Sequence, residues 1–298
     1  MFPLLLLLIG CSDPSFDVAL RLPQDGTLFV TEKTTSTTRT PLGPESLAIK
    51  STIRMDVLQG GRLGTDELHW REEFTRYEVM WENRDFHLEW NMKAEEEIPR
   101  QIRKLGPHSP REVWITPDRE IFLARLPWPE PEPEEGEEPA PEPSPQLVEE
   151  EPGTEEVEEE PAPGPERVSA ATNDLPGYFG GLIHAPTEPA KAGVIWSWTI
   201  AQQVTGGGDV SSTATWTLER VAGTEAVLSE NLVLHSALPP AKGNFRTTGL
   251  HGSGEMRFDL NSGLPVSYTS SYEATLASPS ALGASTVRTA AKFREKRR

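Results

Sequence analysis

Apolar and polar residues alternate along most of this chain, and a period of two is the pattern of β-strands. In the first half of the chain, many of the alternating residues are β-branched or aromatic, as in 28–38, 49–57, 77–81 and 86–92. Residues 82–85 and the pair Pro117-Asp118 separate neighbouring apolar runs and predict hairpin turns. Because only one face of each such strand is apolar, the pattern favours antiparallel sheets with one face packed.

The same alternation returns in the second half, at 194–200, 214–218, 256–260 and 266–272. Gly263 follows Asn261-Ser262 in a turn where a glycine can take positive φ. Each half opens on a long strand after a glycine and closes with a hairpin. We therefore predict a mainly β fold of two related antiparallel modules, residues 11–126 and 171–290, packed as a sandwich or half-barrel. The best helix candidate is 94–104, although Pro99 weakens it.

Composition separates the two predicted modules. The formal net charge is −18, yet residues 127–166 hold 16 Glu, 12 Pro and no Lys or Arg, so the rest of the chain carries only about −2. Such a segment buries too little apolar surface to offset the entropy of ordering its backbone. We predict a disordered acidic linker over 127–170, either a solvated spacer or an arm that binds cations or a partner. Residues 291–298 are rich in Lys and Arg and are predicted to form a basic tail.

The start of the chain is aliphatic from residue 4 to 9 and continues into Gly10 and Cys11. This run is shorter than the roughly 20 residues that a membrane-spanning helix needs, and it fits the core of a secretory signal. Residues 8–11, Leu-Ile-Gly-Cys, resemble the lipobox of bacterial lipoproteins. The resemblance implies that residues 1–10 are a signal peptide, cleaved between Gly10 and Cys11, and that Cys11 carries a lipid such as palmitate. Residues 1–3 lack the positive charge of a signal, so we expect the true start to lie upstream.

The same resemblance bears on location. In diderm bacteria, a Ser such as Ser12 after the lipidated cysteine favours the outer over the inner membrane, so we expect a lipid-anchored protein of the cell envelope. Residues 252–272, with Phe-Asp-Leu-x-x-Gly, are similar to a strand–turn–strand signature of uncharacterised exported β-rich lipoproteins, which implies no activity. The alternative for the apolar start is a buried strand of a cytoplasmic protein. Cys11 is the only cysteine, which excludes an internal disulfide.

The sequence contains no pattern of catalytic or metal-ligating residues. Its six histidines form no His-x-x-x-His pair. Ser253 lacks the flanking glycines of a nucleophile elbow, and 206–208 lack the Lys of a phosphate loop. We expect no enzyme activity, no metal, no cofactor and no nucleic-acid partner.

Tryptophans are the remaining candidates for a binding role. Those that alternate with polar residues could line a ligand pocket, or could equally be ordinary core: Trp81, Trp90, Trp196, Trp198 and Trp216. We expect a non-enzymatic binding or structural module held at a membrane surface, whose protein or lipid partner is unknown. The alternative is a carrier of a lipid or another hydrophobic ligand on a concave sheet face. It requires a dry, aromatic-lined cavity larger than about 300 Å³.

Overall fold

The computed structural model describes residues 14–41, 43–92, 110–126, 166–171, 174–204, 208–237, 245–278 and 281–296. Strands dominate them, and a single helix, α1 (Gly177–Ile183), lies among them. The strands are β1 (Ser15–Phe16), β2 (Arg21–Leu22), β3 (Gly26–Thr40), β4 (Gly43–Gln59), β5 (Gly61–Arg62), β6 (Leu68–Asn83), β7 (His87–Asn91), β8 (Arg111–Ile115), β9 (Ile121–Arg125), β10 (Val168–Ala170), β11 (Ala190–Lys191), β12 (Ile195–Val204), β13 (Gly208–Ala222), β14 (Glu225–Ala237), β15 (Arg246–Asp259), β16 (Leu264–Ser278) and β17 (Ala281–Lys296).

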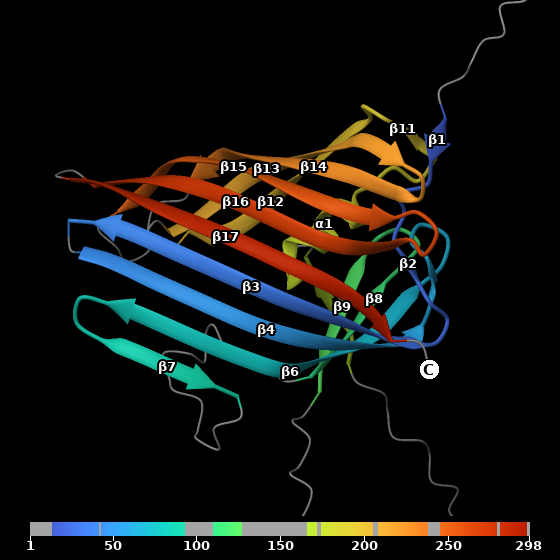
Figure 1. Ribbon diagram of the computed structural model, residues 1–298, viewed down its shortest axis with the longest axis horizontal. Helices are drawn as coiled ribbons and strands as arrows, with labels where there is room; N and C mark the ends of the chain where they lie inside the picture. The colour runs from blue at the N-terminus through green and yellow to red at the C-terminus, as the bar shows by residue number, and fades with distance from the viewer. Residues whose placement is uncertain are drawn as a thin grey trace, which may run out of the picture.

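A 13-stranded antiparallel sheet contains most of these strands, in the order β10-β9-β8-β6-β4-β3-β17-β16-β15-β14-β13-β12, with β7 paired to β6 (Figure 1). The strands of both predicted modules share this sheet because β3 pairs with β17 along nearly its whole length, from Thr27–Lys296 to Arg39–Ala284. The mainly β, antiparallel prediction is confirmed. That the halves are duplicated modules stays a prediction.

Two of the predicted segment boundaries can be compared with the observed strands. Residues 291–296, predicted as a basic tail, are the end of β17, so the boundary at 290 falls inside a strand. Residues 168–170, predicted as linker, form β10 on the sheet edge. The signal peptide with Gly10 and Cys11, the helix expected at 94–104 and linker residues 127–165 lie outside the described residues.

The predicted hairpin turns are confirmed where the structure describes them. Residues 84–86 connect β6 to β7, and Pro117-Asp118 lie between β8 and β9. Gly263 has φ of 70°, and a Cβ there would lie 2.5 Å from the Arg21 side chain. Glycine is therefore required at this turn both for conformation and for space.

The helix α1 lies against the inner face of the curled sheet (Figure 1). Its sequence, Gly-Tyr-Phe-Gly-Gly-Leu-Ile, is apolar on all sides, as expected of a helix that is buried on all sides. A Cβ on Gly181 would meet the Trp216 ring at 2.6 Å, and the indole of Trp196 donates a hydrogen bond of 2.9 Å to the Gly181 carbonyl. Phe179 contacts Trp70 at 5.9 Å between ring centroids, so α1 packs against strands of both halves.

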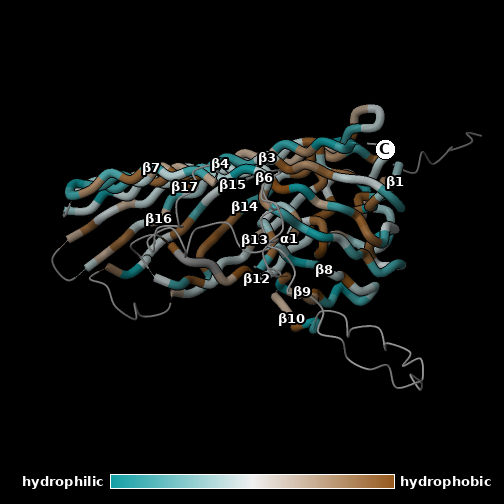
Figure 2. Tube along the Cα trace, turned by 90° about the horizontal axis from the view of Figure 1, so that it is seen from below, coloured by the Kyte–Doolittle hydropathy of each residue, from teal (hydrophilic) through white to brown (hydrophobic). Residues whose placement is uncertain are grey.

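The main core surrounds α1 and draws its side chains from the inward positions of the strands. Apolar and polar residues alternate along the strands in Figure 2, as the sequence predicted. A second, smaller cluster lies on β6 and β7, where Tyr77, Val79 and Trp90 are buried together. Within the described ranges, no helix is both long enough and apolar enough to span a membrane.

Candidate functional site

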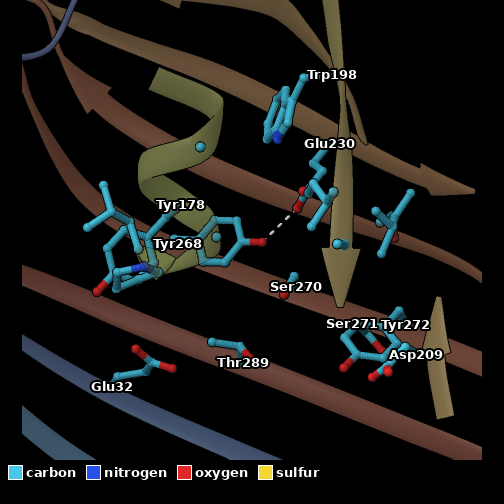
Figure 3. Close-up of a pocket in the computed structure, with 18 residues that line it drawn as sticks. Glu32, Tyr178, Trp198, Asp209, Glu230, Tyr268, Ser270, Ser271, Tyr272 and Thr289 are labelled. Atoms are coloured by element: carbon cyan, nitrogen blue, oxygen red, sulfur yellow. Dashed lines mark hydrogen bonds between the residues drawn. The ribbon is translucent and has the colours of Figure 1, made fainter. Parts of the chain in front are cut away.

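A cavity of about 610 Å³ lies on the inner face of the sheet, beside the first turn of α1. Its walls come from residues 175–178 and 180 and from strands that are distant in sequence: β3, β12, β13, β14, β15, β16 and β17. Figure 3 shows Tyr178 and Glu32 on one side of it, and Trp198 and Glu230 on another. Glu32 is the lining residue that comes from the first half of the chain, and the pairing of β3 with β17 brings it to the cavity.

Glu230 is the most enclosed carboxylate of this cavity, with 8% of the residue exposed. It occupies an inward position of β14, in phase with Leu228 and Leu232. The Tyr268 hydroxyl donates a hydrogen bond of 2.6 Å to Glu230 Oε2. Burial raises the pKa of Glu230, and the Tyr268 hydroxyl and the neighbouring Trp216 indole oppose that rise.

Gly254 provides the space for this carboxylate. It lies opposite Glu230 on β15, and a Cβ at this position would be 2.7 Å from Glu230 Oε2. The same Cβ would be 3.0 Å from the Thr269 carbonyl oxygen, so a side chain could not be accommodated by moving the carboxylate alone. The inward position of the Glu230 side chain thus requires a glycine at the facing position, Gly254.

Glu32 supplies a second carboxylate from β3, in phase with the buried Leu28 and Val30. The Thr34 hydroxyl donates a hydrogen bond of 3.0 Å to Glu32 Oε1. Burial raises the pKa of Glu32, and this hydrogen bond again opposes the rise. A third acidic residue, Asp209, is exposed.

Aromatic rings form the other main part of the wall. Trp198 and Tyr268 border the cavity, and the buried ring of Trp216 lies between them in a stack, with centroid distances of 6.2 and 6.1 Å. Tyr178 packs edge-on against Tyr268 at 5.8 Å. The hydroxyl of Tyr178 is buried and has no hydrogen-bond partner among the described residues.

A hollow of about 650 Å³ lies between the two edges of the sheet. Ile121 and Ala170, from β9 and β10, line it together with Trp198 of β12. The hollow also contains Arg119 and His184, and His184 stacks on Trp198 at 5.1 Å. Burial lowers the pKa of His184, and the nearby Arg119 lowers it further. Trp198 therefore forms part of the wall of both spaces.

The predicted ligand-lining tryptophans separate into three groups. Trp198 lines the cavity. Trp196 and Trp216 are buried in the main core against α1. Trp81 and Trp90 belong to the smaller cluster on β6 and β7, which does not line this cavity.

The polar residues of the site were not predicted, although the alternation pattern of the sequence could have identified them. Glu32 and Glu230 each stand at an inward position of an otherwise apolar alternation. A charged residue in that phase is the mark of a buried polar group. Among the described residues, no group of three or more His, Cys, Asp or Glu side chains could hold a metal ion.

Comparisons with known proteins give the chain no family. No protein-family model and no curated protein matches its sequence. A solved structure of lipovitellin, titled for its lipid–protein interactions, aligns over 92% of this chain with 8% identity and a TM-score of 0.45. This chain spans 25% of the lipovitellin chain. DynF from the dynemicin biosynthesis pathway of Micromonospora chersina aligns over 95% of this chain and 86% of its own, with 7% identity and a TM-score of 0.19. Similarities this weak support no functional argument.

Proposed function

We propose that this protein is a non-enzymatic binding module of the cell envelope, which holds a small ligand between α1 and the inner face of its sheet. The observation that supports it is the cavity of about 610 Å³. Ligand pockets of proteins typically measure about 300–1,000 Å³ and combine aromatic walls with a few converging polar groups. Tyr178, Trp198 and Tyr268 provide such walls, and Glu32 and Glu230 provide such polar groups.

A carrier of a purely hydrophobic ligand is the second candidate, because the volume exceeds what such a carrier requires. The lining argues against it. An acyl chain in this cavity would leave Glu32 and Glu230 facing hydrocarbon, and an unpaired buried carboxylate is costly. We therefore favour a ligand that carries a polar group.

Native mass spectrometry of the protein purified from its own host tests the proposal. We expect an additional small mass on the wild-type protein. The mass should be absent from Ser270→Phe, because Ser270 lines the cavity and a phenyl ring would fill it. Thr269→Phe is the matched control, since Thr269 is the exposed neighbour on the same strand and should retain the mass. A bound mass that survives Ser270→Phe, or no bound mass at all, would contradict a ligand in this cavity.

Attachment to the membrane is a separate part of the proposal, and it rests on the lipobox resemblance of residues 8–11. Each buried methylene of an acyl chain contributes about 0.8 kcal/mol, so two or three chains on residue 11 would anchor the protein firmly. We propose that the anchor lies in the outer membrane. Cys11→Ser should lose palmitate labelling and move to the soluble fraction. Ser12→Ala should keep its palmitate label and stay in the membrane fraction. A Cys11→Ser protein that remains labelled in the membrane would refute the anchor.

A further inference from the structure

The charged side chains that line the cavity beside α1 all have the same sign. Glu32, Asp209 and Glu230 are acidic, and no Lys, Arg or His is among the described residues of the lining. In Figure 3 the three carboxylates lie at separate places around the cavity rather than in one cluster. This arrangement gives the whole space a negative potential, which attracts cations and repels anions.

Glu230 is buried without a compensating positive charge. Its hydrogen-bond donor Tyr268 is neutral, and no basic side chain within the described residues interacts with it. Removing a carboxylate from water is unfavourable unless the charge is paired. A cation bound in the adjoining cavity would supply the positive charge that Glu230 lacks.

Tyr178 borders the cavity from α1, and its hydroxyl is enclosed by protein. The residue is 1% exposed and lines the cavity from α1, yet its hydroxyl has no hydrogen-bond partner among the described residues. Buried hydroxyl groups in folded proteins nearly always have one. Because the hydroxyl has almost no accessible surface, a ligand would reach it only after the surrounding side chains moved.

The aromatic side chains of the wall suit the same class of ligand. Tyr178, Trp198, Tyr268 and Tyr272 all border the cavity. The faces of such rings carry partial negative charge and attract ammonium groups within about 6 Å of the ring centre. Ile200 and Leu232 add apolar surface beside them.

We propose that the ligand is an organic cation, in which an ammonium group meets Glu230 and the aromatic rings while an apolar part contacts Ile200 and Leu232. This inference rests on the proposed binding function and names the chemical class of its ligand. The ammonium group pairs with the buried carboxylate, and the rings shield that pair from water.

Three probes of equal length and different charge test the inference: octylammonium, octanoate and octanol. Isothermal titration calorimetry is carried out near pH 7.5 on protein that native mass spectrometry shows to be free of ligand. We expect octylammonium to bind at least about tenfold more tightly than the other two, because one charge-assisted hydrogen bond is worth roughly that factor or more. Equal or tighter binding of octanoate or octanol would overturn the choice of a cation and leave the binding function standing. No binding by any probe would overturn the choice of a cation, and the absence of a co-purified mass from the wild-type protein would count against the binding function as well.

The variant Glu230→Gln assigns the effect to one carboxylate. It keeps the shape of the side chain and an acceptor for Tyr268, so we expect the fold to persist, with octylammonium binding weakened about tenfold or more. Glu255→Gln is the matched control, because Glu255 is an exposed glutamate on the neighbouring strand β15, and it should bind as the wild type does. If near-UV circular dichroism shows that Glu230→Gln has lost its packing, Glu32→Gln takes its place with the same expectation. Unchanged octylammonium binding in a folded variant would overturn the inference.

Discussion

The hydrogen bond between Tyr268 and Glu230 allows the energetics of the site to be measured without knowing the ligand. Tyr268→Phe removes only the hydroxyl that donates to Glu230 Oε2 at 2.6 Å. The ring remains, with its contacts to Trp216 at 6.1 Å and Tyr178 at 5.8 Å. The measured loss should therefore come from the hydrogen bond and not from packing.

The expected magnitude follows from burial and charge. A hydrogen bond to a charged group contributes about 1.5–3 kcal/mol. Tyr268 is 5% exposed and Glu230 is 8% exposed, so water cannot easily replace the lost donor. We expect the free energy of unfolding to fall by about 1.5–3 kcal/mol and Tm to fall by roughly 3–10 °C.

Urea unfolding followed by near-UV circular dichroism measures this loss. Tyr272→Phe is the matched control, because Tyr272 lies on the same strand and lines the same cavity, and no hydrogen bond from its hydroxyl is found within the described residues. It should change stability by less than about 0.5 kcal/mol. A double-mutant cycle with Glu230→Leu, which removes the acceptor of this hydrogen bond, then isolates the pair. A Tyr268→Phe loss no larger than that of Tyr272→Phe, or strict additivity in the cycle, would refute the assigned hydrogen bond.

Three further changes test other parts of the structure. Gly181→Ala should lower the free energy of unfolding by about 1–3 kcal/mol in urea titrations, because its methyl group would press into the Trp216 ring; an unchanged midpoint would contradict the close packing of α1. Burial alone would raise the pKa of Asp17, but hydrogen bonds from Arg62 and Arg21 outweigh it and hold the pKa at about 2, below the usual 3.8. The stability from Asp17 is therefore complete above pH 3.8 and is lost as pH falls towards 2. Asp17→Asn should lower Tm at neutral pH and reduce the fall of Tm on acidification. A difference in Tm between variant and wild type that stays constant with pH would contradict this assignment. Tyr178→Phe removes a hydroxyl without a hydrogen-bond partner and should raise the free energy of unfolding by about 1–3 kcal/mol, while a decrease in urea titrations would show that the hydroxyl is satisfied.

Local pattern predicted most of the long strands, because alternation and turn residues act over a few positions, but it did not identify β17 or β10. It could not predict that β3 would pair with β17, since the two strands are more than two hundred residues apart and both have one packed face. Nor did it reveal α1. Residues 177–183 are few and contain three glycines, so their helical conformation depends on packing inside the sheet and not on intrinsic propensity.

The binding site was harder to predict than the fold because candidates were selected by residue type. Tryptophans are large and often line pockets, yet only Trp198 of the five candidates borders this cavity. Strand phase would have been the better guide. Glu32 and Glu230 interrupt apolar inward positions, and Gly254 faces Glu230 across the sheet, but that last relation depends on strand register, which a single sequence does not reveal.

A purely structural role for Glu230 and a binding role lead to opposite expectations for stability. Because burial raises the pKa of Glu230, the folded protein binds its proton more readily than the unfolded chain does. Its contribution to stability therefore declines as pH rises from the ordinary value of 4.5 through the raised value, and the ionised carboxylate is a penalty at neutral pH. Glu230→Gln removes that penalty and still accepts a hydrogen bond from Tyr268.

At pH 7.5 this variant should be at least as stable as the wild type, and its Tm should depend less on pH between 4.5 and 7.5. A Glu230→Gln protein that is markedly less stable at pH 7.5 would mean that the carboxylate supports the fold, and the case for a missing cation would fail. Greater stability combined with weaker octylammonium binding is the result expected of a residue that serves a ligand at the expense of the fold.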